Sequence, residues 1–146
     1  MQARFPVAVH IFLLHDNQVL LLRRANTGYE DGNYSVVAGH LDGGESVTQA
    51  AIREAHEEVG IALRPMDLTV VGVMHRVSHE ERIDFFLVAT TWGGKPTNQE
   101  PNKCSELRWC ALDALPANTI PYVQAALENF RGGVWFAEFG WPDARS

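Results

Sequence analysis

Residues 39–61 read GHLDGGESVTQAAIREAHEEVGI, a glycine-containing loop followed by a helical pattern. Ser46 and Gln49 form a capping-box pair, so a helix is expected to begin directly after Ser46. Gly60 suits the left-handed position that ends a helix. The stretch therefore predicts a helix over residues 47–59.

Three glutamates of this helix share one side. At the pitch of an α-helix, Glu54, Glu57 and Glu58 lie within a sector of ~100°. The opposite side carries apolar residues that we expect to pack inward: Ile52, Ala55 and Val59. Carboxylates three and four residues apart repel each other, and a hard cation with oxygen ligands would compensate. On their own, three glutamates fit a solvated acidic face equally well, so further residues must decide.

Those further residues match a known motif. The stretch fits the Nudix box, G-x5-E-x7-R-E-U-x-E-E-x-G-U with U apolar, at every position. The chain therefore resembles the Nudix (MutT-like) hydrolases, which use divalent metal to cleave a diphosphate linkage in nucleoside diphosphate derivatives. The residues that carry the match are Gly39, Glu45, Arg53, Glu54, Glu57, Glu58 and Gly60.

The resemblance implies a metal site for Mg²⁺ or Mn²⁺. Gly39 would offer its backbone carbonyl, and Glu57 and Glu58 would be carboxylate ligands. Glu54 would be either a further ligand or the base that takes a proton from the attacking water. Magnesium accepts only one or two carboxylates and keeps several waters, so a larger cluster would favour more than one ion.

Residues around these ligands also receive roles from the resemblance. Glu45 and Arg53 would form an ion pair that steadies the loop and orients the catalytic glutamates. A distal carboxylate is expected from the loop after the long strands, where Glu100 is favoured over Glu106 because it lies within the loop. His40 could approach a phosphate, although a loop histidine is commonly just exposed to solvent.

The substrate is less well defined than the reaction. The proline and tyrosine signatures of ADP-ribose and diadenosine polyphosphate hydrolases are absent downstream of the box. The segment LPAN, residues 115–118, is similar to MutT-type enzymes, in which an asparagine contacts the purine. We therefore expect a nucleoside triphosphate as substrate, with Asn118 at the base or, alternatively, as a helix N-cap. ADP-ribose or nucleotide-sugar hydrolysis and a non-catalytic nucleotide-sensing module are the alternatives.

Composition restricts the partners. A net charge of −6 over 146 residues argues against a nucleic-acid polymer or an anionic membrane as partner and leaves a small nucleotide. The apolar run over residues 5–14 is too short to span a bilayer. Cys104 and Cys110 are too few for a disulfide framework, so a reduced, cytoplasmic protein is expected.

The remaining pattern predicts one α/β domain over residues 1–146. A hairpin is expected over residues 5–24 around Asp16-Asn17, followed by a loop over 25–33. Further strands are expected at residues 34–38, 68–77, 83–92 and 107–112, and a second helix at 120–131. The resemblance implies a Nudix α/β/α sandwich, with a mixed β-sheet between helices, which this order of elements supports.

The C-terminal segment is rich in aromatic residues. Trp135, Phe136, Phe139 and Trp141 lie within seven positions. We expect a last strand packed against the edge of the sheet; a homodimer contact or a surface that stacks on a base is the alternative.

Overall fold

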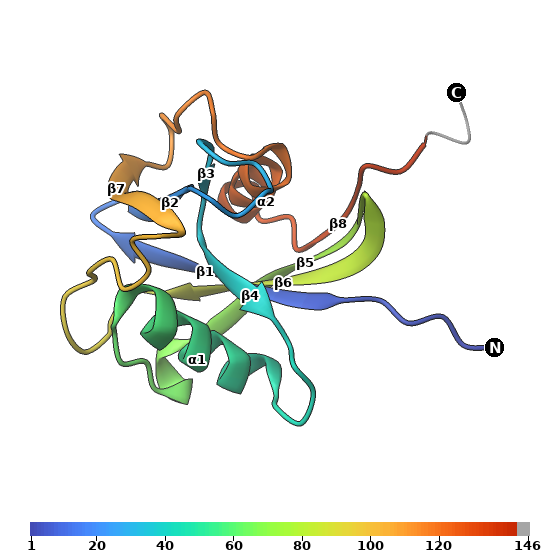
Figure 1. The fold of residues 1–146 in the computed structure, drawn as a ribbon, viewed down its shortest axis with the longest axis horizontal. Helices are drawn as coiled ribbons and strands as arrows, with labels where there is room; N and C mark the ends of the chain where they lie inside the picture. Colours follow the sequence, from blue (N-terminus) through green and yellow to red (C-terminus); the bar gives the residue numbers. More distant parts are fainter. Residues whose placement is uncertain (143–146) are drawn as a thin grey trace.

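The computed structural model describes residues 1–142 and has a twisted mixed sheet between α-helices (Figure 1). Helix α1 (Val47–Val59) covers one face of the sheet and helix α2 (Pro121–Gly132) covers the other. The predicted α/β/α sandwich is therefore confirmed. The strands are β1 (Val7–His15), β2 (Gln18–Arg24), β3 (Tyr34–Ser35), β4 (Val37–His40), β5 (Thr69–Ser78), β6 (Glu80–Ala89), β7 (Cys104–Ala111) and β8 (Phe136–Phe139).

Strand β1 is central to the sheet. It pairs antiparallel with β2 and β4 and parallel with β6. On the far side of β6, β5 pairs antiparallel with β6 and parallel with the edge strand β8. Strand β2 pairs antiparallel with β3 and β7. The arrangement places β4 next to β1. After Gly39 and His40, which end β4, the chain continues through a loop into α1.

Side chains of β1 alternate between two apolar cores. Val9, Ile11 and Leu13 belong to the core under α1, whereas Phe12 belongs to the core under α2. This is the period of two expected for a strand that is buried on both faces. The hairpin prediction is confirmed as well, because Asp16 and Asn17 both have positive φ, as a tight two-residue turn requires.

Helix α1 has the predicted bounds and caps. The Ser46 hydroxyl accepts from the backbone N–H of Gln49 at 3.1 Å, and the Gln49 side chain accepts from the N–H of Ser46 at 2.8 Å. Gly60 ends the helix with φ of 72°. Ala55 and Val59 are buried, so the apolar side of the helix packs inward and its carboxylates remain on the other side.

Two strand predictions were wrong in their extent. The segment expected as one strand over residues 34–38 is divided into β3 and β4, which pair with different neighbours, β2 and β1. The polar residues expected to form a loop before residue 83 instead extend β6 back to Glu80, with His79 alone at the turn. Their side chains are paired near the hairpin end: Glu81 contacts His75 of β5 at 2.6 Å, and Arg82 contacts Glu80 within β6 at 2.8 Å.

The C-terminal part agrees with the expected order. Helix α2 begins at Pro121, which needs no N–H partner in the first turn, and ends before Gly133. The aromatic segment forms β8 at the sheet edge, as predicted. A short 3₁₀ helix, Pro65–Asp67, was not predicted. Within residues 1–142, no helix combines the length and the apolar character needed to cross a membrane.

Candidate functional site

Gly39 and Glu54 bring β4 and α1 into direct contact. Gly39 pairs with Val9 of β1, and a Cβ atom at Gly39 would lie 2.1 Å from the carboxyl carbon of Glu54. Any side chain at position 39 would displace the Glu54 carboxylate. The backbone of β4 and the Glu54 carboxylate therefore lie as close together as a shared ligand would require.

Arg53 and Glu45 form the predicted ion pair. Arg53 donates from Nε to Glu45 Oε2 at 3.0 Å and from Nη2 to Oε1 at 2.6 Å. The same guanidinium donates to Glu54 Oε1 at 2.8 Å and to the carbonyl of His40 at 3.2 Å. Hydrogen bonds from Arg53 lower the pKa of Glu45. Arg53 therefore connects three parts of the site: Glu45 in the loop before α1, the His40 carbonyl of β4 and the Glu54 carboxylate.

Glu58 lies where carboxylates crowd together. Its Oε1 accepts from the backbone N–H of Ala38 at 3.3 Å. Burial, a hydrogen bond with Glu54 and the charge of Glu100 hold the pKa of Glu58 well above its usual range. Glu57 is less enclosed, with its side chain 51% exposed and 3.4 Å from Arg53 Nη1. The structure thus separates the paired glutamates into an enclosed one and an open one.

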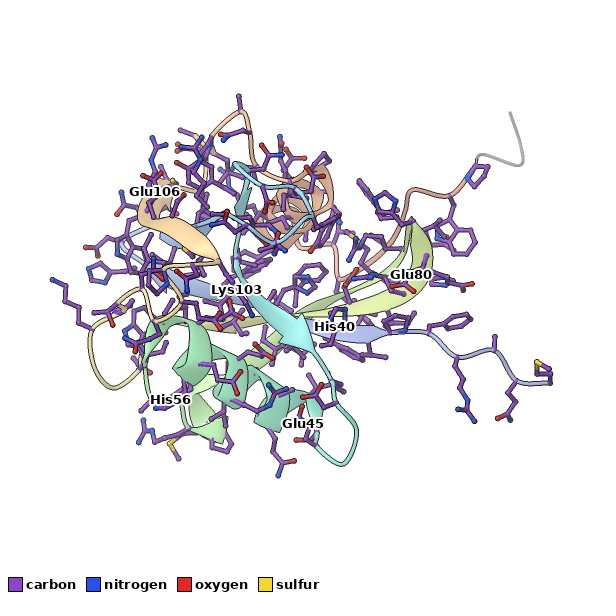
Figure 2. All side chains as sticks on the ribbon, viewed as in Figure 1. His40, Glu45, His56, Glu80, Lys103 and Glu106 are labelled. Atoms are coloured by element: carbon purple, nitrogen blue, oxygen red, sulfur yellow. The ribbon has the colours of Figure 1, made fainter. Side chains whose placement is uncertain are left out.

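These carboxylates line a cavity of about 450 Å³ between β4, the loop after β2 and the sheet. Its cationic side chains are Arg23, Arg24, Arg82 and Lys103. Figure 2 shows Lys103 and His40 near the middle of the molecule, above helix α1, with Glu45 in the loop before that helix. The cavity therefore offers carboxylates from α1 and Glu100, together with several positive charges for an anionic ligand.

The two candidates for the distal carboxylate lie in different places, and only Glu100 lines the cavity. Glu100 is half-buried and lines the cavity. Glu106 lies on β7, exposed, and accepts a hydrogen bond from the Tyr34 hydroxyl (Figure 2). Of the two candidates, Glu100 is the one that reaches the box glutamates.

The predicted substrate contacts differ in placement. His40 lines the cavity, exposed, with Nε2 3.5 Å from Arg82 Nη1. Asn118 instead donates from Nδ2 to the carbonyl of Gly32 at 2.9 Å and does not line the cavity within residues 1–142. The alternative that Asn118 caps a helix is wrong, because Ile120 holds the N-cap position of α2. Base contact by Asn118 stays a prediction.

The donor set suits a hard divalent cation. Among the described residues, no three His, Cys, Asp or Glu side chains enclose a common point. Magnesium requires less than that, because it binds one or two carboxylates and keeps its waters. The carboxylates of Glu54 and Glu58, beside the backbone of Gly39, meet this requirement, with Glu57 and Glu100 at the same cavity.

A polar group at the floor of the cavity was not predicted from the sequence. It consists of buried residues from β1, β5, β6 and α2: His10, Arg76, Asp84 and Tyr122. A signal was present, because His10 lies within the apolar part of β1 and Asp84 within the apolar part of β6. What the sequence did not reveal is that these distant positions meet.

Arg53→Ala is expected to lower the melting temperature by roughly 2–6 °C, because it removes about 1 kcal/mol of charged hydrogen bonding. Arg53→Lys should recover little of this, since lysine cannot reproduce the two-point contact with Glu45. Thermal melts of both variants test the prediction. An unchanged melting temperature in Arg53→Ala would show that the ion pair contributes nothing to the fold.

Millimolar Mg²⁺ or Mn²⁺ is expected to raise the melting temperature, because the ion offsets repulsion among the carboxylates and binds the unfolded chain poorly. At a hundredfold excess over the dissociation constant the gain is ~2.7 kcal/mol. Melts in metal, in chelator and in sodium chloride of matched ionic strength measure it. If sodium chloride gives the same shift, these carboxylates hold no specific ion.

Comparison with known proteins gives a consistent result. Residues 4–130 match the family model of the NUDIX domain. The chain is 31% identical over 114 residues to the NAD-capped RNA hydrolase NudC of Stutzerimonas stutzeri, covering 78% of this chain and 39% of that protein. It is 26% identical over 119 residues to the 8-oxo-dGTP diphosphatase of Escherichia coli, covering 81% and 88%. The chain thus spans less than half the length of the NudC relative.

A solved structure shows the same architecture. The crystal structure of a MutT NUDIX hydrolase from Burkholderia pseudomallei superposes with a TM-score of 0.79 at 29% identity, covering 86% of this chain and 98% of that one.

Proposed function

The chain belongs to the Nudix hydrolase family, and from this premise we propose that it is a pyrophosphohydrolase that converts nucleoside triphosphates to the monophosphate and pyrophosphate. The observation that carries the proposal is the cavity of about 450 Å³, where the carboxylates of α1 face the same space as four cationic side chains. Metal-binding carboxylates beside cations are what a triphosphate chain requires, because its charge must be neutralised while one linkage is attacked.

One curated relative, the 8-oxo-dGTP diphosphatase of Escherichia coli, is named for a nucleoside triphosphate substrate. The 8-oxo-dGTP diphosphatase is matched over 88% of its length, whereas NudC is matched over 39% of its length. The name of the 8-oxo-dGTP diphosphatase supports the triphosphate proposal for this chain.

We assign Glu54, Glu58 and the Gly39 carbonyl as ligands of a divalent ion, Mg²⁺ or Mn²⁺, with Glu57 and Glu100 as further carboxylates of the site. When bound, such an ion stabilises charge on phosphate oxygens and lowers the pKa of a water. The resemblance allows Glu54 to be a ligand or the base, and its place beside Gly39 favours the role of ligand in this proposal. Arg53 keeps Glu54 in place through its contact of 2.8 Å.

The cationic side chains have a separate role in the proposal. Arg24 is held by its own contacts to the loop, from Nε to the Tyr29 carbonyl at 2.8 Å and from Nη2 to Thr27 at 3.1 Å. Its charge is therefore presented to the cavity in a fixed position. Lys103 is exposed and free to follow a phosphate. Together they would neutralise the phosphates that the metal does not contact.

A hydrolysis screen tests the function. With Mg²⁺ in excess, nucleoside triphosphates should be cleaved faster than ADP-ribose, a nucleotide sugar or NADH, and each nucleotide should yield its monophosphate. Faster cleavage of ADP-ribose, the sugar or NADH would overturn the triphosphate assignment. Binding of nucleotides without cleavage of any of them would favour the nucleotide-sensing alternative.

A further inference from the structure

The loop between β2 and β3, residues 25–33, is organised around the hydroxyl group of Thr27. Thr27 Oγ1 lies 2.6 Å from Asp31 Oδ1 and 3.1 Å from Arg24 Nη2. The backbone nitrogen of Tyr29 lies 3.2 Å from the same oxygen. Arg24, Thr27 and Tyr29 line the cavity of the candidate site, whereas Asp31 is exposed outside its lining. The hydroxyl therefore connects a carboxylate outside the cavity to an arginine at its wall.

The single proton of this hydroxyl can be placed. A threonine hydroxyl donates one hydrogen bond and has two lone pairs that accept. Arg24 Nη2 and the backbone nitrogen of Tyr29 are donors, so they take the two lone pairs. The proton is left for Asp31 Oδ1 at 2.6 Å, which is nearer than the other acceptor, the Tyr29 carbonyl oxygen at 3.0 Å. Donation to Asp31 thus directs a lone pair of Thr27 towards Arg24.

Asp31 is itself held in place. Its Oδ2 accepts from the backbone N–H groups of Thr27 at 3.1 Å and Gly28 at 2.9 Å. The hydrogen bond from the Thr27 hydroxyl is the main cause of a lowered pKa of Asp31, and the bond from the Gly28 N–H adds to it. The carboxylate is therefore ionised near neutral pH and remains an acceptor for the Thr27 proton.

Arg24 has a second contact in the same loop. Its Nε donates to the carbonyl oxygen of Tyr29 at 2.8 Å, and its guanidinium carbon lies 5.2 Å from the centre of the Tyr29 ring. Both hydrogen-bond acceptors of Arg24, a carbonyl and a hydroxyl, are uncharged, so they leave its positive charge for a ligand. Within residues 1–142, Nη1 of Arg24 has no hydrogen-bond partner and is not enclosed by protein. The guanidinium is thus fixed at two nitrogens and available at the third.

A role in stability alone accounts poorly for this arrangement. Thr27 and Asp31 are exposed, and hydrogen bonds that water could replace contribute little to stability. An arginine that is held before a ligand arrives loses less rotamer freedom on binding than a mobile one does. The loop is therefore better suited to preparing Arg24 for a ligand in the cavity.

We propose that Thr27 is a positioning residue for substrate binding: its hydroxyl, directed by Asp31, holds the guanidinium of Arg24 where it binds a phosphate group of the substrate. Guanidinium groups bind phosphate oxygens through charge-assisted hydrogen bonds, whose strength depends on orientation. This inference deepens the proposed function and rests on it for the triphosphate substrate. Its test is therefore a binding measurement, which is independent of cleavage.

The probe is the α,β-methylene analogue of GTP, in which a carbon bridge replaces the linkage that the proposed reaction cleaves. Its affinity is measured by calorimetry in excess Mg²⁺. Thr27→Val keeps the size of the side chain but removes the hydroxyl, so it should weaken binding about 10-fold, the order expected for a lost hydrogen bond to a charged group. Thr27→Ser keeps the hydroxyl and should bind nearly as tightly as wild type. With GTP itself, Thr27→Val should raise KM and leave kcat within about 2-fold, because the metal site is untouched.

A double-variant cycle shows whether Thr27 acts through Arg24. Arg24→Met should weaken binding of the analogue at least as much as Thr27→Val does. In the Arg24→Met protein, the further change Thr27→Val should have no effect, because the guanidinium that Thr27 positions is gone. A continued loss of affinity would mean that Thr27 acts by another route, and it would overturn the inference.

Asp31→Ala separates position from charge. Removing a negative charge near the cavity would by itself strengthen the binding of an anion. The inference predicts weaker binding instead, because the Thr27 hydroxyl loses the acceptor of its proton. Stronger binding in Asp31→Ala would overturn the role given to Asp31.

Thr91→Val is the matched control. Thr91 is exposed and donates from Oγ1 to Asp67 Oδ1 at 3.1 Å, and neither residue lines the cavity. This variant loses the same kind of hydrogen bond and should keep the wild-type affinity. Thermal melts report the folding of every variant.

The outcomes separate the inference from the proposed function. Equal affinities of wild type and Thr27→Val would overturn the inference, and cleavage of GTP would then leave the proposed hydrolysis standing. No binding of the analogue by wild type would also overturn it, as would a Thr27→Ser variant as weak as Thr27→Val. An affinity that depends on Thr27 only when Arg24 is present, without cleavage of any triphosphate, would support the inference and contradict the proposed hydrolysis.

Discussion

Glu58→Gln is expected to reduce turnover at least ~100-fold, because it replaces a charged oxygen ligand by a neutral amide at the most enclosed carboxylate of the site. Glutamine keeps the shape of the side chain and can still accept from the N–H of Ala38, which Glu58 contacts at 3.3 Å. The variant should therefore fold. Steady-state rates with saturating Mg²⁺, accompanied by a thermal melt, measure both effects.

A matched control distinguishes this effect from a general change of charge. Glu128 is exposed on α2 and contacts Gln124 at 3.1 Å, so Glu128→Gln removes the same charge outside the cavity lining. It should retain the wild-type rate. Near-normal turnover in Glu58→Gln would mean that α1 is not the catalytic helix.

Arg76→Met is expected to destabilise the protein by 3–5 kcal/mol, an estimate of about the size found when one partner of a buried ion pair is removed. Arg76 is 1% exposed and Asp84 is 0% exposed, so the change leaves a buried carboxylate without its counter-charge. The packing of the guanidinium on Tyr122 is lost as well. The midpoint of urea unfolding, compared with that of wild type at an unchanged slope, gives the size of the loss.

The double variant Arg76→Met/Asp84→Leu should recover most of that stability, since it removes both charges and leaves apolar side chains under α2. Recovery of stability in the double variant would show that the single variant is destabilised because Asp84 is left without its counter-charge. A single variant as stable as wild type would show that Asp84 is neutralised by some other group, and the account of the cavity floor would then be wrong.

Local signals predicted the parts of the fold that depend on neighbouring residues. Helix α1 has its predicted bounds because Ser46, Gln49 and Gly60 satisfy its ends within the same stretch of sequence. The turn at Asp16-Asn17 is equally local. The division between β3 and β4 was not predicted, because it depends on two partners, β2 and β1, that bind successive parts of one short segment.

The loop predicted for the polar residues at the start of β6 was wrong for a related reason. Glu80, Glu81 and Arg82 look like a loop in sequence, but their charges pair along the end of a hairpin. Charged residues are uncommon in strands, and the sequence alone does not show that Glu81 has a partner, His75, on the neighbouring strand.

The candidate site shows the same contrast. The glutamates and Gly39 could be predicted because one helix and the strand before it carry them at a fixed spacing. The floor residues come from positions as far apart as His10 and Tyr122, 112 residues along the chain, and only the folded sheet and α2 bring them together. A polar residue inside the apolar part of a strand, as at His10 and Asp84, is the one sequence signal that could have indicated them.

The most direct test of the central claim is the identity of the products formed from a nucleoside triphosphate by the wild-type protein, followed over time by anion-exchange chromatography. The account predicts monophosphate and pyrophosphate in equal amounts, formed with Mg²⁺ and abolished by excess chelator. Formation of diphosphate and inorganic phosphate, cleavage that persists in chelator, or no cleavage of any triphosphate would contradict it.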